Sequence, residues 1–407
     1  MTFLAFLRAN APFLAAGFVL AFSSTFGQTV FIALFAGQVM TAFGLSDGQW
    51  GLIYTAATGA SALAMIQAGA VADRLRIRAL GLAVTAGLAL ACLGMAATQG
   101  AATLALAVFA LRFLGQGMTG LLASLAMARW FVRSRGKALA ISSTGFAVGQ
   151  AVLPLAFVWA LAFADWRTLW VVAAAIALST LPLVRRLLRA ERTPEAIAAE
   201  AQTTGLEARH WTRADVLRHP LFWALVPLLL GPPAFGTALL FHQVHIAAVR
   251  GWPLADYVAL LPLLTAVSIA ATFAAGAILD RVGSAWMLKV YLLPFAAAFA
   301  VLAASDTLPA AGMGFALLGL GLGMQATVPT AFWAEFYGTR HLGAIKAMAS
   351  AIMVLGTAIG PGLTGLVIDA GTPFPAQMPA VAFYFLGAGT LAAIAVTRAQ
   401  RGLTAPA

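Results

Sequence analysis

Charged residues are scarce in this sequence. They make up 9% of its 407 residues, whereas 62% are hydrophobic and the mean hydropathy is +0.93. A soluble domain contains about 45–50% apolar residues, so this composition excludes a soluble enzyme and a disordered chain. The apolar runs are continuous and about 20 residues long, whereas the strands of an outer-membrane barrel alternate. The sequence therefore predicts an all-α membrane protein.

Cysteine is nearly absent, and so are the motifs of several functional classes. Cys92 is the single cysteine, so no internal disulfide forms, and its place in an apolar run predicts a packing role. The sequence has neither the phosphate-binding loop of a primary pump nor a His-Glu-x-x-His metal pair. It also lacks a nucleophile paired with a base at span depth and a repeated polar ring that would line a channel. We therefore expect no enzyme activity, no cofactor and no metal.

Breaks between the apolar runs predict twelve transmembrane helices. They cover residues 12–37, 50–71, 79–98, 101–127, 138–160, 166–184, 221–248, 254–279, 285–304, 309–334, 347–369 and 378–397. A polar segment over 185–220 divides the chain into two six-helix halves, 1–184 and 221–407. Within that segment, the spacing of Thr212 and Asp215 predicts the capping pair of a short helix at the membrane surface.

The net charge of +11 follows the predicted loops. Twenty-one of the 24 lysines and arginines fall in segments that lie on one side of the membrane if the N-terminus is inside. The positive-inside rule then places both termini in the cytoplasm. Because the basic charge reports topology, no nucleic-acid partner is expected. The exceptions are Arg167 and Arg250 at outer ends and Arg112 inside a span.

The two halves repeat one another in sequence. Gly69-Ala-Val-Ala-Asp73-Arg74 ends the second span, and Gly276-Ala-Ile-Leu-Asp280-Arg281 ends the eighth, at an offset of 207 residues. The Gly-x-Gly-Met pattern at 115–118 returns at 321–324, and the glycine pair of the fifth span returns in the eleventh. Such internal duplication is typical of transporter folds, and it predicts two pseudo-symmetric bundles.

These repeated motifs have a physical logic. An aspartate beyond a membrane helix end can accept hydrogen bonds at the N-terminus of a neighbouring helix, where the helix dipole favours negative charge. This predicts gating residues on the cytoplasmic face, although a plain helix stop with topogenic arginines is the alternative. The predicted gating residues are Gly69, Asp73, Arg74, Asp280 and Arg281. The residues predicted to allow close helix packing, with bending as an added role, are Gly145, Gly149, Pro154, Gly356, Gly360 and Pro361.

The loop signature Gly-x-x-x-Asp-Arg, with its copy in the second half, resembles the major facilitator superfamily over essentially the whole chain. More narrowly, the stretches at 130–140, 216–223 and 343–346 look like the bacterial branch near the oxalate/formate and monocarboxylate transporters. The resemblance implies the twelve-helix fold of that superfamily, a bacterial inner-membrane location and function as a monomer. Many drug antiporters of the superfamily have glycines four and six positions after the helix 4 arginine. Here the glycines follow Arg112 at three and five positions, which departs from that pattern.

Arg112 is the most informative single residue. Counting about 1.5 Å per residue from the outer helix end places it roughly 15 Å deep, near the bilayer midplane. Its counterpart in the second half is Leu318, so the charge is not part of the shared scaffold. Arginine binds a carboxylate in two-point fashion, which predicts an anchor for an anionic substrate. The alternative is that Arg112 hydrogen-bonds backbone carbonyls or glutamine side chains within the bundle.

Other polar side chains at similar depth are candidates for the wall of a central cavity. Each alone is more often an interhelical hydrogen bonder, so the prediction depends on their shared depth. The candidates are Thr25, Gln28, Gln116, Gln150, Thr265, Ser268 and Gln325, of which Gln116 is expected to share a helix face with Arg112.

No carboxylate stands at the midplane as a proton carrier, because all 13 acidic residues fall in loops or at span ends. Because imidazole is the side chain whose ordinary protonation range includes physiological pH, His242 and His245 are possible proton sites, but they lie near the outer end, where a structural role is the alternative. A weak acid that carries its own proton, or anion exchange at Arg112, needs no protein carboxylate.

The leading hypothesis is therefore a secondary active transporter that works by alternating access. It moves a small, monocarboxylate-like organic anion by proton symport or anion exchange. The alternative is a proton-coupled drug efflux antiporter. The expected partners are the small-molecule substrate, the lipid bilayer and possible coupling protons.

Overall fold

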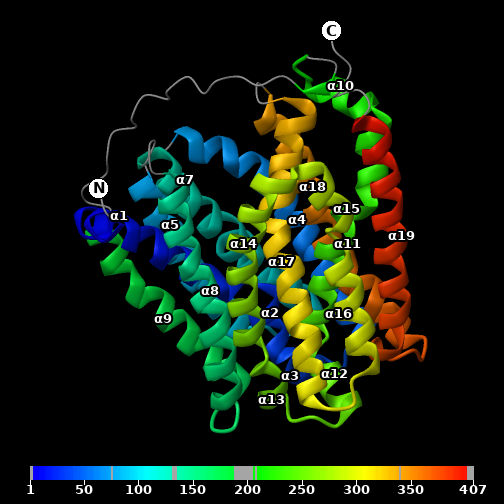
Figure 1. The fold of residues 1–407 in the computed structure, drawn as a ribbon. Coiled ribbons are helices and arrows are strands. Elements are labelled where there is room, and N and C mark those ends of the chain that lie inside the picture. The colour runs from blue at the N-terminus through cyan, green and yellow to red at the C-terminus, as the bar shows by residue number, and fades with distance from the viewer. Residues whose placement is uncertain are drawn as a thin grey trace. The chain divides into compact units, whose positions relative to one another are not determined.

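The computed structural model describes residues 3–74, 77–130, 135–187, 205–206, 209–338 and 341–400. Every regular element in these ranges is a helix. Contacts between Cα atoms divide the chain into two compact units, Met1–Ala199 and Glu200–Ala407. Each unit is a helical bundle (Figure 1), which confirms the predicted all-α class.

Unit 1 contains nine α-helices and three other helical segments in the described ranges. They are α1 (Phe3–Ser23), η1 (Ser24–Gly27), α2 (Thr29–Ile32), η2 (Ala33–Phe35), α3 (Ala36–Phe43), α4 (Asp47–Arg74), α5 (Ile77–Ala96), α6 (Ala101–Ala110), η3 (Leu111–Thr119), α7 (Gly120–Trp130), α8 (Arg135–Ala160) and α9 (Trp166–Leu187).

The regular elements in the described part of unit 2 are also helices. They are α10 (Arg213–Arg218), α11 (Pro220–Phe241), α12 (Gln243–Arg250), α13 (Leu254–Val258), α14 (Leu261–Val282), α15 (Ser284–Val290), α16 (Leu293–Ala304), α17 (Leu308–Tyr337), α18 (Leu342–Asp369) and α19 (Phe374–Gln400).

In the described ranges, 11 segments are long and apolar enough to cross a membrane, and a bent pair, Thr29–Phe43 with Asp47–Met65, brings the total to 12. The predicted multi-pass architecture is confirmed. Several spans that the sequence predicts as single helices are interrupted, however. The predicted span 12–37 breaks after Gly27, 101–127 contains η3, and 221–248 breaks at His242. Hydropathy reports only how apolar a segment is, so it does not register these breaks.

Glycines let the first and fifth membrane spans of each unit pack closely. In unit 1, a Cβ atom at Gly145 would lie 2.1 Å from the Phe18 carbonyl oxygen of α1. In unit 2, a Cβ atom at Gly360 would lie 2.1 Å from the Ala234 carbonyl oxygen of α11. Since a side chain fits at neither position, the pairs α1–α8 and α11–α18 require glycine where they cross.

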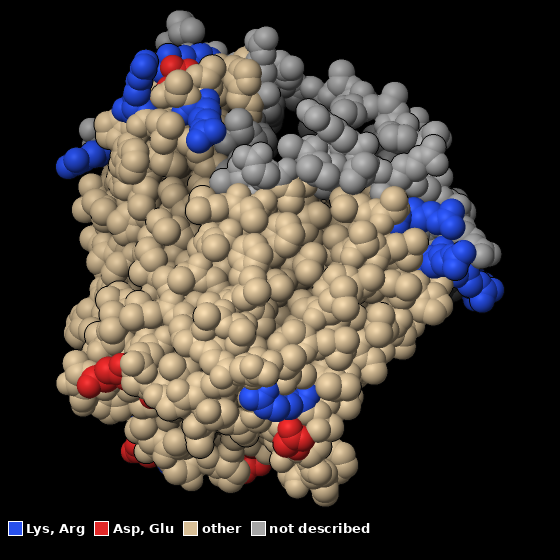
Figure 2. Space-filling model, turned by 180° about the vertical axis from the view of Figure 1, so that it is seen from behind, with Lys and Arg blue, Asp and Glu red and all other residues tan. Residues whose placement is uncertain are grey.

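Charged side chains lie near the helix ends, and a broad band of uncharged surface separates them (Figure 2). Large apolar side chains are exposed on the spans, such as Leu63 at 70%, Phe273 at 69% and Phe383 at 72%. Exposed apolar side chains of this size suit contact with lipid. Trp159, Phe163 and Trp223 are exposed near span ends, where aromatic rings favour the membrane–water interface.

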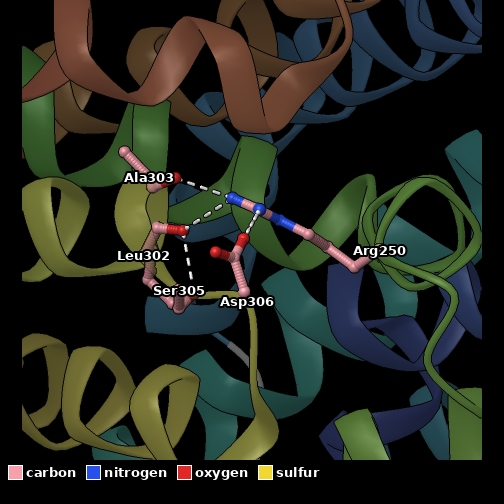
Figure 3. A network of polar contacts seen from close by, with 5 residues as sticks. All are labelled: Arg250, Leu302, Ala303, Ser305 and Asp306. Atoms are coloured by element: carbon pink, nitrogen blue, oxygen red, sulfur yellow. Dashed lines mark hydrogen bonds and ion pairs between the residues drawn. The ribbon is translucent and has the colours of Figure 1, made fainter.

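The two arginines at predicted outer ends have structural partners. Arg250 binds the carboxylate of Asp306 at 2.8 Å, and its second terminal nitrogen donates to the carbonyl oxygens of Leu302 and Ala303 (Figure 3). In unit 1, Arg167 donates to the carbonyl oxygens of Ala96 and Thr98, each at 2.7 Å.

Both arginines therefore cap the C-terminus of a helix. Arg167 caps α5 and Arg250 caps α16, which are the third spans of their halves. A cation at that end satisfies free carbonyl groups and matches the negative end of the helix dipole. This structural role explains why the two residues depart from the positive-inside pattern.

The predicted capping pair in the polar segment is present. The Thr212 side chain accepts a hydrogen bond from the Asp215 backbone, and the Asp215 carboxylate accepts one from the Thr212 backbone at 3.0 Å. The Thr212 hydroxyl also lies 2.6 Å from the Asp215 carboxylate, and its hydrogen bond, followed by the one from the Thr212 backbone, lowers the pKa of the Asp215 carboxyl. Trp211 next to the cap is buried, and its indole packs edge-on against Tyr337. The end of this segment is thus fixed to the last turn of α17.

Candidate functional site

The first span of unit 1 is broken around a polar stretch. Between α1 and α2 the chain passes through η1, and Gln28 adopts an extended backbone conformation with φ −81° and ψ 149°. The break frees backbone groups inside a membrane span, which is tolerated only where other groups satisfy them. Gly27 and Gln28 are the residues at the break.

A second irregular segment faces this break. Residues Leu111–Thr119 form a π-helix, η3, which is supported by the Thr119 hydroxyl donating to the Leu114 carbonyl oxygen at 2.6 Å. A Cβ atom at Gly27 would lie 2.2 Å from the Leu111 carbonyl oxygen and 2.7 Å from the Gly115 Cα atom. The two backbones therefore touch. π-Helical turns of this kind occur frequently at functional sites.

Arg112 lies in η3 and connects the two irregular segments. Its side chain is only 1% exposed. One terminal nitrogen, Nη1, donates to the Gly27 carbonyl oxygen at 3.2 Å and to the Thr29 hydroxyl at 3.3 Å. Thr29 in turn hydrogen-bonds the Tyr54 hydroxyl. Arg112 thus satisfies a carbonyl group at the break, as the alternative interpretation of this residue expects.

The guanidinium group retains unused donors. Of its five N–H bonds, the described contacts engage those of Nη1, and Nε is buried without a hydrogen-bond partner. The Cζ atom lies 5.3 Å from the centre of the Tyr54 ring, which gives a cation–π contact. None of the described carboxylates forms an ion pair with Arg112. The charge therefore lies in the span without an acidic counter-ion among these residues.

Aromatic packing holds the broken segment in place. Phe31 in α2 is fully buried, and its ring lies 4.9 Å from that of Phe157 in α8 and 5.3 Å from that of Trp170 in α9. Phe26 in η1 contacts Phe31 edge-on at 5.2 Å. Rings in such edge-to-face contact add packing energy beyond their buried area. The aromatic packing around η1 and α2 therefore fixes the position of the break that Arg112 contacts.

The other predicted site residues of unit 1 differ in their placement. Thr25 is fully buried with its hydroxyl unbonded, and it lies against Gly149 of α8. Gln28 is 9% exposed at the break itself. Gln116 is half-buried in η3, where the π-helix replaces the α-helical geometry on which its expected shared face with Arg112 depends. Gln150 is half-buried in α8.

The candidates in unit 2 lie near the crossing of α14 and α17, which run side by side (Figure 1). A Cβ atom at Gly323 would lie 2.7 Å from the Ser268 carbonyl oxygen. Thr265 of α14 and Gln325 of α17 are half-buried near this crossing. The structure thus brings Arg112 together with the broken first span, and it places Thr265 and Gln325 in the other unit.

The predicted gating motifs lie at the ends of two helices. Asp73 and Arg74 end α4, and Asp280 and Arg281 lie in the last turn of α14. The surroundings of Gly69 and the side chains of Asp73, Arg74 and Asp280 lie outside the described part of the structure, whereas Arg281 is exposed. Pro154 and Pro361 lie inside α8 and α18.

The predicted histidine pair lies at the break between α11 and α12. His242 is 2% exposed, and its Nε2 lies 3.2 Å from the Pro361 carbonyl oxygen and 3.0 Å from the Thr364 hydroxyl of α18. In the tautomer with its proton on Nε2, the ring donates to the Pro361 carbonyl oxygen. His245 accepts a hydrogen bond from the Phe374 backbone at 3.4 Å. The pair thus connects the seventh span to the last two.

Three residues of the Arg112 site were not predicted from the sequence, namely Gly27, Thr29 and Tyr54. A signal was available for the first two, because residues 23–29 gather serine, threonine, glycine and glutamine within an apolar run. Tyr54 gives no such signal, since its contact with Thr29 joins positions 25 residues apart.

Comparison with known proteins places the chain in a family. The family model described as Major Facilitator Superfamily matches residues 17–313. No curated protein sequence matches the chain. A bacterial homologue of the human lysosomal transporter Spinster, in an inward-facing and unoccupied conformation, is similar over 98% of this chain and 99% of its own, with a TM-score of 0.73 and 19% identity.

Two further solved structures share the fold. The inward-facing and occupied form of a bacterial Spinster homologue has a TM-score of 0.65 and 19% identity, and covers 97% of both chains. A mutant of the nucleoside transporter NupG has a TM-score of 0.69 and 14% identity, over 95% of this chain and 99% of that one. At these identities the likeness concerns the fold. Because the family model covers most of its length, this chain belongs to the major facilitator superfamily of multi-pass membrane transporters.

Proposed function

We propose that this transporter moves a small organic anion, monocarboxylate-like in size and charge, by alternating access. The observation that carries the proposal is Arg112, a cation buried in a membrane span with no carboxylate partner in the described chain. An unpaired charge in this position is costly. An anionic substrate would supply the missing counter-charge, whereas a cationic drug would add to the cost.

The donor geometry supports two-point binding of a carboxylate. Nη1 is occupied by Gly27 and Thr29, which leaves the side edge formed by Nε and the second terminal nitrogen. Two parallel N–H bonds on one planar edge match the two oxygens of a carboxylate. Because Nε is buried, the substrate reaches this edge only when the neighbouring side chains move. Thr25, Gln28, Gln116 and Gln150 are proposed to complete the site within unit 1. Thr265 and Gln325 of unit 2 are proposed as further substrate-binding residues.

Coupling is proposed to be proton symport or anion exchange. The described acidic side chains lie at helix ends or in loops, so a weak acid that carries its own proton, or an exchanged anion, accounts for coupling without a carboxylate in the site. His242 and His245 are also proposed as candidate sites for a coupling proton. The imidazole of His242 contacts α18 through Nε2. The helix-end motifs around Asp73 and Asp280 are proposed as gates.

The proposed orientation rests on the distribution of lysine and arginine, and the proposed location and assembly rest on the resemblance to the superfamily. We propose a multi-pass protein of the bacterial inner membrane with both termini in the cytoplasm, functioning as a monomer. The domain boundaries are proposed at 1–184 and 221–407, joined by a linker over 185–220.

Uptake into proteoliposomes tests the function. The substrate panel contains radiolabelled mono- and dicarboxylates, a nucleoside and a cationic dye, each with and without a pH gradient. Wild type is compared with Arg112→Lys and Arg112→Gln, and Arg218→Gln on exposed α10 is the matched control for loss of one positive charge. We expect saturable carboxylate uptake that falls at least tenfold in Arg112→Gln, is partly kept in Arg112→Lys and is unchanged in the control.

Other outcomes contradict the proposal. Dye movement that the gradient drives, equal in wild type and Arg112→Gln, would favour the drug antiporter. Nucleoside uptake without carboxylate uptake would move the substrate class toward that of the nucleoside transporter NupG. Thermal unfolding of each variant separates loss of transport from loss of fold, because Arg112 also satisfies the Gly27 carbonyl group.

A further inference from the structure

Unit 2 carries a groove between the first turns of α11 and the last turns of α19, which run alongside one another in Figure 1. Its volume is about 380 Å³. The residues that line it are His219, Pro220, Leu221, Ala224, Leu391, Ile394, Ala395, Arg398 and Ala399. The function proposed above does not use this groove.

The groove lies where two membrane spans end. Pro220 begins one span and Gln400 ends the other, so the groove opens at the membrane–water interface. Its apolar wall includes Leu391 at 44% and Ile394 at 48% exposure. Next to it, Trp223 is 58% exposed and donates its indole N–H to the Leu217 carbonyl oxygen at 2.7 Å. A tryptophan held in this way is typical of the interface.

The polar end of the groove is basic. Arg398 and His219 are its titratable lining residues, and no carboxylate is among the residues that line it. The His219 ring is fixed, since Nδ1 lies 3.3 Å from the Tyr337 hydroxyl and the ring packs edge-on against Trp211. Arg218 is exposed beside it. The nearby Asp215 carboxylate carries one negative charge, which the two arginines Arg218 and Arg398 exceed, so the local charge is positive.

An apolar channel with a basic mouth at the membrane interface matches the two chemical parts of a phospholipid. An acyl chain would cover the leucine, isoleucine and alanine side chains, and a phosphate would face the guanidinium group. A net negative headgroup is favoured over a zwitterionic one, because basic residues near the membrane surface each attract anionic lipid by about 1 kcal/mol.

We propose that this groove binds one anionic phospholipid, with its phosphate at Arg398 and His219 and one acyl chain along Leu221, Leu391 and Ile394. The bound lipid contacts both the first turns of α11 and the last turns of α19. The site is distinct from the Arg112 region and does not depend on the substrate proposed for it.

Native mass spectrometry of the full chain in detergent tests the proposal. The protein is titrated with phosphatidylglycerol, with phosphatidylcholine of the same acyl chains, and with inorganic phosphate as a competitor. The variants are Arg398→Gln, the control Arg218→Gln, and Ala395→Phe, which fills the groove. We expect binding of the first phosphatidylglycerol to weaken about fivefold in Arg398→Gln, because the phosphate loses its partner in the groove. In Arg218→Gln, which does not line the groove, we expect less than a twofold change.

Four results would overturn the proposal. Equal retention of both lipids by wild type would remove headgroup recognition, and equal weakening by Arg398→Gln and Arg218→Gln would reduce the effect to general charge. Displacement of the lipid by inorganic phosphate would identify a free-anion site. Ala395→Phe is expected to lower binding of phosphatidylglycerol with an unchanged unfolding temperature in lipid-free detergent. Unaltered binding by a folded Ala395→Phe would place the lipid elsewhere.

Discussion

Single polar side chains in this protein serve helices that end or break inside the bundle. Arg112 donates to the Gly27 carbonyl oxygen at the break of the first span, and His242 contacts the Pro361 carbonyl oxygen where the seventh span breaks. In both cases a side chain from one helix meets a backbone group of another. Of the Arg112 site, the sequence predicted the arginine, because a charge in an apolar run is conspicuous. It did not predict Thr29 and Tyr54, because the contact between two distant hydroxyls depends on tertiary packing.

Asp165 provides a pH-dependent test at the residue scale. It precedes α9, and its carboxylate accepts hydrogen bonds from the Thr168 hydroxyl and from the backbones of Arg167 and Thr168. The Thr168 side chain contributes most to lowering the pKa of this carboxyl, followed by the Thr168 backbone. Since the folded pKa lies below the unfolded one, the stabilisation is present above the unfolded value, near 4, and is lost as the pH falls through the folded value.

The measurement compares unfolding temperatures of wild type and Asp165→Asn between pH 6.5 and pH 3. Asparagine keeps the helix cap but does not titrate, so we expect wild type to lose its advantage over the variant as the pH falls. Thr168→Val removes the largest contribution and should flatten the wild-type dependence. A difference between Asp165→Asn and wild type that stays constant over the whole range would contradict the prediction.

At the scale of helices, the lengths and number of spans follow from composition, but their interruptions do not. The predicted span 285–304 is divided into α15 and α16, and the predicted span 254–279 into α13 and α14. Pro262 and Pro294 each lie in the first turn of the second helix of the pair, where proline is tolerated. The π-helix η3 has no such marker, because it depends on the contact between Gly27 and Gly115. An interruption that depends on contact with a neighbouring helix therefore cannot be predicted from the local sequence pattern.

The cap of α16 yields a test at this scale. Arg250→Gln removes two hydrogen bonds to carbonyl oxygens and the ion pair with Asp306. Asp306→Asn removes only the ion pair, and the Asp306 side chain is 87% exposed. We expect Asp306→Asn to cost about 0–1 kcal/mol, as exposed pairs do. Arg250→Gln is expected to cost about 1–3 kcal/mol, because the part-buried Ala303 carbonyl group loses the arginine donor, whereas the Leu302 carbonyl group keeps Ser305 as a donor.

Unfolding of both single variants and the double variant in mild detergent measures these costs. If the carbonyl contacts dominate, the double variant is close to Arg250→Gln alone. Equal losses in the two single variants would assign the stabilisation to the ion pair and contradict the capping role.

At the scale of the whole chain, composition and charge predicted more than any local motif. The scarcity of charge identified a membrane protein, the apolar runs gave the number of spans, and the repeated motifs indicated the superfamily that the family comparison confirms. The transported compound was not predictable in the same way, since the superfamily fold is shared by transporters as different as the Spinster homologue and NupG.

Membrane orientation is testable with single cysteines. Cys92 is buried and is the only cysteine of the chain, so Cys92→Ala gives a background without thiols. In that background we expect Asp306→Cys to react with a membrane-impermeant maleimide in intact cells, and Arg218→Cys to react only after the membrane is opened. The reverse pattern would place the termini outside, and labelling of both sites in intact cells would contradict a fixed topology.

The caps formed by Arg167 and Arg250 bear on how the two halves diverged. The same need, free carbonyl groups at the end of the third span, is met in each half by an arginine from a different part of the chain, the start of α9 in one and the end of α12 in the other. The repeat predicted from the sequence is thus compatible with a structural requirement that both halves share and that different residues fulfil. Ancestry between the halves is better traced through the groups that need a partner than through the side chains that supply one.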